Sequence, residues 1–147
     1  MKSLIAFILG ASLLVASSAG GAESEDRSVQ VAVPAAQAWL EIVDAAQYPK
    51  SWEAASQIFK QALSEDTWSQ KVTAARQPLG NLVTRKLSTA LFTHNPPGAP
   101  EGDYVIIQYE SAFANNSHVV ETVTPMRDPD GQWRVSGYFI RIHSAAN

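Results

Sequence analysis

The chain has 147 residues, no cysteine and a formal net charge of −3 at pH 7. This length suits one domain, and 46% apolar residues with four tryptophans can supply its hydrophobic core. The acidic balance argues against a basic nucleic-acid-binding surface, and the lack of cysteine excludes disulfides and thiol nucleophiles.

The first 22 residues have the pattern of a secretory signal peptide. Lys2 precedes an apolar run from Leu4 to Val15, and small residues follow as far as Ala22. A run of about a dozen residues is too short for a membrane-spanning helix, which needs about 20. We expect cleavage after Ala19 or Ala22, and a periplasmic or secreted protein with no membrane segment or attached lipid. An uncleaved anchor is the alternative.

Residues 23–32 are polar, and we expect a flexible tail before a single domain over residues 33–147. Apolar residues at helical spacing then predict three helices. The first extends from Pro34 to Ala46, the second from Pro49 to Leu63, and the third follows Ser64 as its N-cap. Their tryptophans are expected to lie in the core.

The apolar period then changes to two and predicts four strands, over residues 83–91, 104–113, 118–127 and 131–143. Turn residues separate them, including a Pro/Gly-rich segment over 94–102 and the pair Asn115-Asn116. The last strand has large apolar residues on both faces, so we expect it inside the sheet. The fold class is α+β: three N-terminal helices packed on a curved four-stranded antiparallel sheet.

One face of this sheet is the more apolar, and we expect the helices to cover it. In chain order the face carries Val83, Leu87, Leu91, Val105, Ile107, Tyr109, Phe113, Val120, Met126, Trp133, Val135 and Phe139.

Several segments together resemble an exported bacterial family catalogued as domain of unknown function 4019. They are the Trp39 and Trp52 helices, Arg76–Gly80 leading to Arg85–Leu87, Pro97–Tyr104, and Gly131–Arg141. The resemblance covers nearly the whole chain after the leader and implies no activity. Helices followed by a curved sheet also resemble the nuclear-transport-factor-2-like (cone) fold. That fold hosts ketosteroid-isomerase-type and dehydratase-type enzymes as well as non-catalytic domains, so it does not decide function.

A row of acidic and phenolic side chains is the candidate for catalysis. If Asn115-Asn116 is a two-residue turn, Glu110 faces Glu121, and Glu121 in turn faces Tyr138. Buried carboxylates beside a tyrosine would suit acid–base chemistry. On a solvated face the same row would be an ordinary polar surface.

A group of cationic side chains is the candidate for ligand binding. The same register gathers four of them toward one end of the helix-facing surface: Arg85, His118, Arg141 and His143. At the mouth of an apolar cavity they would hold a carboxylate or another anion. In the alternative, Arg85 pairs with a helix acid such as Glu41, Asp44 or Glu53, and both histidines lie at the rim.

No motif for phosphate, dinucleotide or metal chemistry is present, so we expect no cofactor. His94 belongs to the opposite end of the sheet from the other two histidines, which argues against a three-histidine metal site. We favour a non-catalytic exported domain that binds a small anionic or amphipathic ligand or a partner protein. A cone-fold enzyme using a carboxylate and Tyr138 is one alternative.

The other alternative is a homodimeric structural module. Its interface would be the outer sheet face, with Ile106, Val119, Val123, Ile140 and Ile142. A hollow interior that contains Arg85 would favour ligand binding, and a filled interior would favour the structural module.

Overall fold

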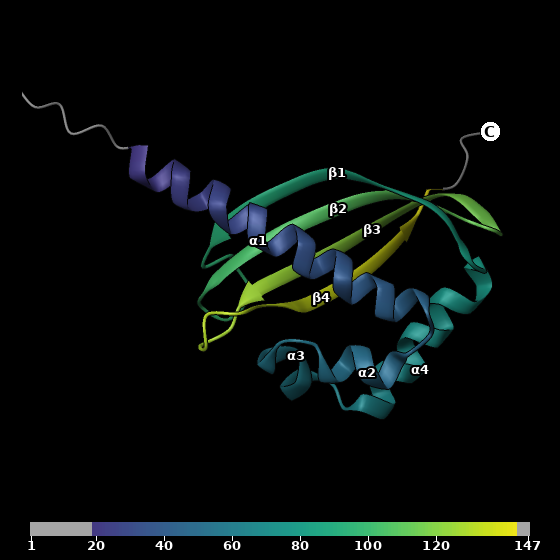
Figure 1. Ribbon diagram of the computed structural model, residues 1–147. Coiled ribbons are helices and arrows are strands. Elements are labelled where there is room, and N and C mark those ends of the chain that lie inside the picture. Colours follow the sequence, from purple (N-terminus) through teal and green to yellow (C-terminus); the bar gives the residue numbers. More distant parts are fainter. Residues whose placement is uncertain (1–18, 144–147) are drawn as a thin grey trace, which may run out of the picture.

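Helix α1 (Ala19–Asp44) lies across one face of the sheet and contacts each of the four strands (Figure 1). The computed structural model describes residues 19–143, so most of the predicted signal peptide lies outside the described residues. The expected tail over residues 23–32 is instead helical. Ala32 is buried, and Val29 packs against the core, so tertiary contacts extend the helix N-terminally past Pro34.

Three short helices follow: α2 (Tyr48–Glu53), α3 (Gln57–Ala62) and α4 (Glu65–Arg76), and a 3₁₀ turn over Gln77–Leu79 ends the helical part. The single helix expected from Pro49 to Leu63 is therefore two helices. The break occurs at Ser56, whose extended backbone caps α3 and whose N–H donates to the Val135 carbonyl at 2.8 Å. Ser64 caps α4 as predicted, accepting from the Thr67 N–H.

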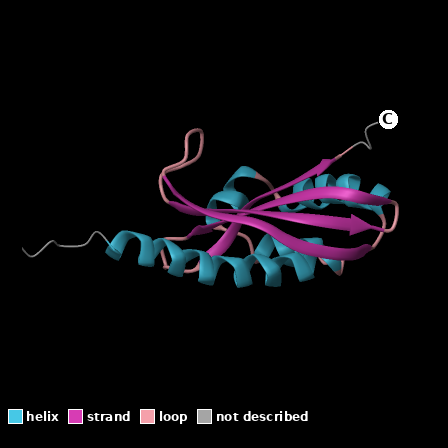
Figure 2. Ribbon diagram, turned by 90° about the horizontal axis from the view of Figure 1, so that it is seen from above, coloured by secondary structure: helices cyan, strands magenta, loops and turns pink. Residues whose placement is uncertain are grey.

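The four predicted strands are confirmed. They are β1 (Leu82–His94), β2 (Asp103–Phe113), β3 (Asn116–Arg127) and β4 (Trp133–Ile142), and they form an antiparallel meander in the order β1-β2-β3-β4. In Figure 2 α1 lies along one side of these strands. Among the described residues, no helix is both long and apolar enough to cross a membrane.

The prediction that the last strand lies inside the sheet is wrong, because β4 is an edge strand. Its apolar residues are covered differently from those of a central strand. Val135 is buried, and Trp133 and Tyr138 pack against the helical core, while Phe139 remains 66% exposed. The helices α2–α4 lie beyond this edge of the sheet (Figure 1).

Register shifts in the sheet turn several side chains to the face opposite to the one that we expected. The β3–β4 register shifts between Thr124 and Pro125, so Val135 faces the helices before the shift and Tyr138 faces them after it. Strand β2 follows the prediction, with all four expected residues buried. The other strands do not: Val83, Leu87, Leu91 and Phe139 are exposed, and in β3 Val119 and Val123 are buried while Val120 pairs with exposed Glu110.

Aromatic side chains fill the space between the helices and the sheet. The Trp68 ring lies 5.7 Å from the Trp39 ring and 5.0 Å from the Phe59 ring, measured between centroids. Both indole N–H groups donate to Ser51, a buried residue of α2. The expectation that these tryptophans belong to the core is confirmed, and the interior that they occupy is packed with side chains.

Candidate functional site

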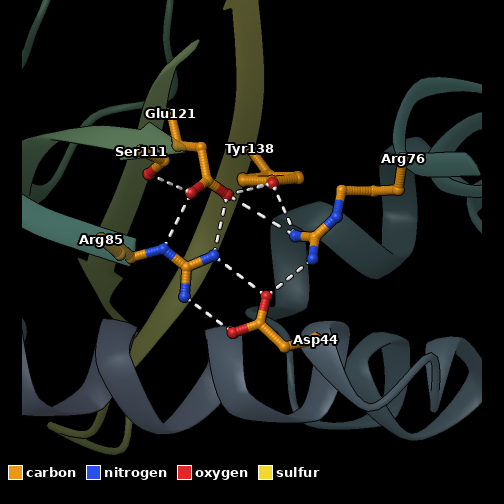
Figure 3. Close-up of polar contacts among 6 residues, drawn as sticks. All are labelled: Asp44, Arg76, Arg85, Ser111, Glu121 and Tyr138. Atoms are coloured by element: carbon orange, nitrogen blue, oxygen red, sulfur yellow. Dashed lines mark hydrogen bonds and ion pairs between the residues drawn. The ribbon is translucent and has the colours of Figure 1, made fainter. Parts of the chain in front are cut away.

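A buried polar network joins the helices to all four strands (Figure 3). Each of six elements contributes one residue: Asp44 from α1, Arg76 from α4, Arg85 from β1, Ser111 from β2, Glu121 from β3 and Tyr138 from β4. Two guanidinium groups face two carboxylates, so the network is formally neutral. This balance matters because an unpaired charge at such a depth would be strongly destabilising.

Glu121 lies at the centre of the network and is wholly buried, at 0% exposure. Its carboxylate accepts hydrogen bonds from Arg85 Nε at 2.8 Å and Arg85 Nη2 at 3.1 Å. The Ser111 hydroxyl donates at 2.6 Å, and the Tyr138 hydroxyl donates to the other oxygen. The carboxylate is therefore satisfied on both oxygens without water.

Asp44 is the second carboxylate of the network. It is the last residue of α1, and its side chain is 22% exposed. Arg85 Nη1 and Arg76 Nη2 each donate to it at 2.7 Å. Burial alone would raise the pKa of Asp44, but the hydrogen bonds from Arg85 and Arg76 outweigh burial and lower this pKa. The carboxylate therefore stays charged at neutral pH and ties α1 to β1 and α4.

Arg76 and Tyr138 close the network on the side of α4. The Arg76 guanidinium lies 4.8 Å from the centroid of the Phe113 ring and donates to the Tyr138 oxygen at 3.1 Å. Burial and the negative charge of Glu121 raise the pKa of Tyr138, and Arg76 only partly opposes them. Tyr138 is therefore a permanent hydrogen-bond donor at ordinary pH, which suits a structural cross-link rather than a proton shuttle.

Tyr109 lies beside this network with a buried hydroxyl that has no hydrogen-bond partner among the described residues. Burial raises the pKa of this phenol, while the nearby Arg85 charge lowers it and Glu121 raises it. The ring packs in the core, but the hydroxyl adds a polar group there without a compensating bond.

The structure separates Arg85 from the other three residues of the expected cationic group. Arg85 pairs with Asp44, as in the structural alternative. His118, Arg141 and His143 are exposed on the face of the sheet away from the helices. The His143 N–H donates to the His118 carbonyl at 2.9 Å, which places the two histidines opposite each other. Both histidines line a hollow of about 490 Å³ there with Lys86 and Glu110.

The expected facing pair Glu110 and Glu121 is not formed. The β2–β3 turn lies one residue early, because the N–H groups of Ala114 and Asn115 donate to the carbonyls of Asn81 and Leu79. A register shift between Ser111 and Phe113 then pairs Glu110 with Val120 on the exposed face and turns Glu121 to the helix-facing side. Tyr138 does reach Glu121, diagonally, although its direct partner is Val123.

Two network members, Arg76 and Ser111, were not expected from the sequence. Arg76 continues the buried stripe of α4 at a spacing of four residues after Trp68 and Val72, which is the signal that could have identified it. His94 pairs with Asp103 at 2.7 Å, at the opposite end of β1 from Leu82. In the described part of the chain, no cluster of three or more metal-ligating side chains occurs.

An apolar groove lies between α3, α4 and the edge of β4, with a volume of about 420 Å³. Ten of the residues that line it are Phe59, Ala62, Leu63, Trp68, Val72, Ala75, Gly137, Tyr138, Phe139 and Ile140. Ser136 and Lys71 complete the lining, and Lys71 is its one charged residue. The groove thus combines an apolar floor with a single positive charge.

Comparison with known proteins identifies the family. A family model described as "Protein of unknown function (DUF4019)" matches residues 35–138. No curated protein and no solved structure matches the chain. The matched segment contains all six residues of the buried network and all four strands up to Tyr138. Because the match covers well over half of the sequence, the chain belongs to the DUF4019 family.

Proposed function

We propose that this protein is a non-catalytic exported domain that binds an apolar ligand with an anionic group in the groove beside β4. The observation that carries the proposal is the groove itself, whose lining from α3, α4 and β4 is mainly apolar and includes one charged residue, Lys71. Its volume of about 420 Å³ is within the usual range for small-ligand sites.

The interior is occupied, which argues against an anion site around Arg85 and leaves the groove as the candidate site. The neutral network and the Trp39–Trp68 cluster fill the space in which we had considered an anion site around Arg85. A filled interior is the outcome that we expected to favour the structural module. We also propose a cone-like fold, supported by helices that precede a curved sheet, with the network in the place of an internal ligand cavity.

The enzymatic alternative has one supporting contact, between Tyr138 and Glu121. Glu121 is wholly buried, however, and both of its oxygens lie within 3.6 Å of arginine nitrogens. The homodimer alternative loses the interface that we expected, because Val119 and Val123 are buried under the helices. Both observations move the proposed recognition site to the groove.

Dodecanoate, an apolar chain with one carboxylate, tests the proposed site. The Ala75→Trp substitution should fill the groove and weaken dodecanoate binding at least tenfold by calorimetry, because Ala75 lines it. Ala74→Trp is the matched control, since Ala74 is exposed on the same helix and does not line the groove. Equal affinities of the Ala75→Trp variant and the wild type would refute the assignment.

The charge of Lys71 should contribute to the same binding. Lys71→Gln removes the one cation of the groove, so the dodecanoate dissociation constant should rise about fivefold, corresponding to about 1 kcal/mol. Dodecanol, which has no carboxylate, should bind the wild type and this variant equally. A loss of dodecanol affinity would show that the substitution perturbs the groove rather than the ion pair.

We further propose export, with cleavage after Ala19 or Ala22, from the sequence pattern of residues 1–22. Mass spectrometry of the protein from its native host would give the mature N-terminus. A chain that begins at Gly20 or at Glu23 is expected, and an intact Met1 start in the membrane fraction would indicate the uncleaved anchor instead.

A further inference from the structure

Strand β4 has an unpaired edge that opens onto the groove. The His143 N–H donates to the His118 carbonyl, which fixes the alternation of the β3–β4 ladder. By this alternation the backbone groups of Phe139 and Arg141 point toward β3, while those of Tyr138 and Ile140 point away from the sheet. In the described part of the chain, no hydrogen bond outside the ladder uses the backbone of Tyr138 or Ile140.

The start of the same edge shows that it accepts backbone partners. The Val135 carbonyl already receives the Ser56 N–H at 2.8 Å. After Val135, no helix backbone group in the described part of the chain donates to or accepts from this edge, and the groove lining begins at Ser136. The β3–β4 register is regular from Gly137 to Ile142, whereas β1, the other edge strand, has two register shifts. A regular edge is the better template for another strand.

The side chains around this edge define what an added strand would carry. Residues opposite Tyr138 and Ile140 would point to the helix side of the sheet, where Phe59, Leu63 and Val72 form the floor. The residue between them would cover the exposed Phe139 ring. Three consecutive apolar residues of the added strand would thus be buried. Such a partner would explain why β4 is apolar on both faces although it has only one neighbouring strand.

We infer that the groove binds an extended apolar peptide segment with a nearby carboxylate, which adds to β4 as a fifth strand. This inference rests on the proposed function and specifies its ligand. The carboxylate follows from Lys71, the one charge of the groove. A second copy of β4 fits less well, because Trp133–Ile142 contains two arginines and no acidic residue.

N-methylated peptides test strand addition directly. The probe is acetyl-Thr-Val-Leu-Val-Thr-Glu-amide at up to millimolar concentration, with two isomers N-methylated at alternate amides. Only one set of alternate amides can face β4 in an added strand. One isomer should therefore bind at least tenfold more weakly than the unmodified peptide, and the other should bind within about threefold of it.

Hydrogen exchange at β4 gives a second readout on the full folded chain. The peptide should slow exchange of the Tyr138 and Ile140 amides, while the Phe139 and Arg141 amides, already paired with β3, should change little. Equal binding of both isomers, or no binding of any peptide while dodecanoate still binds, would overturn strand addition and leave the groove assignment intact. Failure of dodecanoate as well would overturn the proposed function.

Discussion

The hydroxyl groups of Tyr138 and Tyr109 allow a matched comparison in the same interior. Tyr138→Phe removes a donor from Glu121 and an acceptor from Arg76, so the free energy of unfolding should fall by about 1–3 kcal/mol. Tyr109→Phe removes a buried hydroxyl without a partner and should leave stability unchanged or raise it slightly. Urea unfolding measures both. Equal losses would show that Tyr109 also has a stabilising contact.

Arg85 is the residue whose loss should be most costly. Arg85→Met leaves Arg76 as the one guanidinium facing both Glu121 and Asp44, so the buried network would carry an uncompensated negative charge, which should cost about 3–5 kcal/mol of unfolding free energy. Arg141→Met, at an exposed position of β4, is the control and should change stability by less than about 0.5 kcal/mol. Similar small effects of both substitutions in urea unfolding would contradict a structural network.

Acid should weaken the link between α1 and the rest of the network. The folded-state pKa of Asp44 lies below its ordinary value of 3.8, so its contribution is fully present above that value and is lost as pH falls through the lower, folded-state pKa. Unfolding free energy measured from pH 6 to pH 2 should therefore decline below about pH 4. Asp44→Asn should show a shallower decline, and an unchanged slope would assign the acid sensitivity to other carboxylates.

Within α1, Pro34 is the residue that opposes helix formation. It lies inside the helix, where it provides no N–H for the Gln30 carbonyl and where an internal proline costs about 3 kcal/mol. Pro34→Ala also loosens the unfolded chain by up to about 1 kcal/mol, so a net stabilisation of about 1–2 kcal/mol is expected.

Gln37→Ala, at an exposed position of the same helix, should change stability by less than about 0.5 kcal/mol. Thermal unfolding followed by circular dichroism compares the two variants. A destabilised Pro34→Ala variant would mean that packing of α1 on the sheet requires the local geometry that proline imposes.

Local signals in the sequence were sufficient to predict one helix and the four strands. The Ser64 cap, the change of apolar period after residue 80 and the turn-forming segments predicted α4 and four strands. The break at Ser56 was not predictable locally, because it depends on a backbone hydrogen bond to Val135, far along the chain. The helical state of residues 23–32 likewise depends on burial of Ala32 against the core.

Strand register was harder to predict than strand existence. The register shift between Ser111 and Phe113 moved Glu121 from the expected exposed face to the helix-facing side, and the shift between Thr124 and Pro125 reversed the expected faces of Tyr138 and Phe139. The pairing of Arg85 with Asp44 was one of two alternatives from the sequence. The whole network was not predictable, because its six residues meet only when all elements are assembled.

In the molecule as a whole, the buried network of charged side chains connects the helices to the sheet, and the apolar groove beside β4 is the exposed site. The network connects α1 and α4 to every strand and has no net charge, so it can hold the layers together without binding an external ion. The groove outside β4 has the opposite character, with one positive charge on an apolar floor. This division is the reason for placing recognition at the edge of the sheet.

A single NMR titration with dodecanoate tests this division most directly. The methyl signals of Leu63, Val72 and Ile140, which line the groove, should shift with ligand concentration. The Nε–Hε signal of Arg85, held by Glu121, should not move. A shift of the Arg85 signal without a response from the groove methyl groups would contradict the account, because the interior network would then be the binding site.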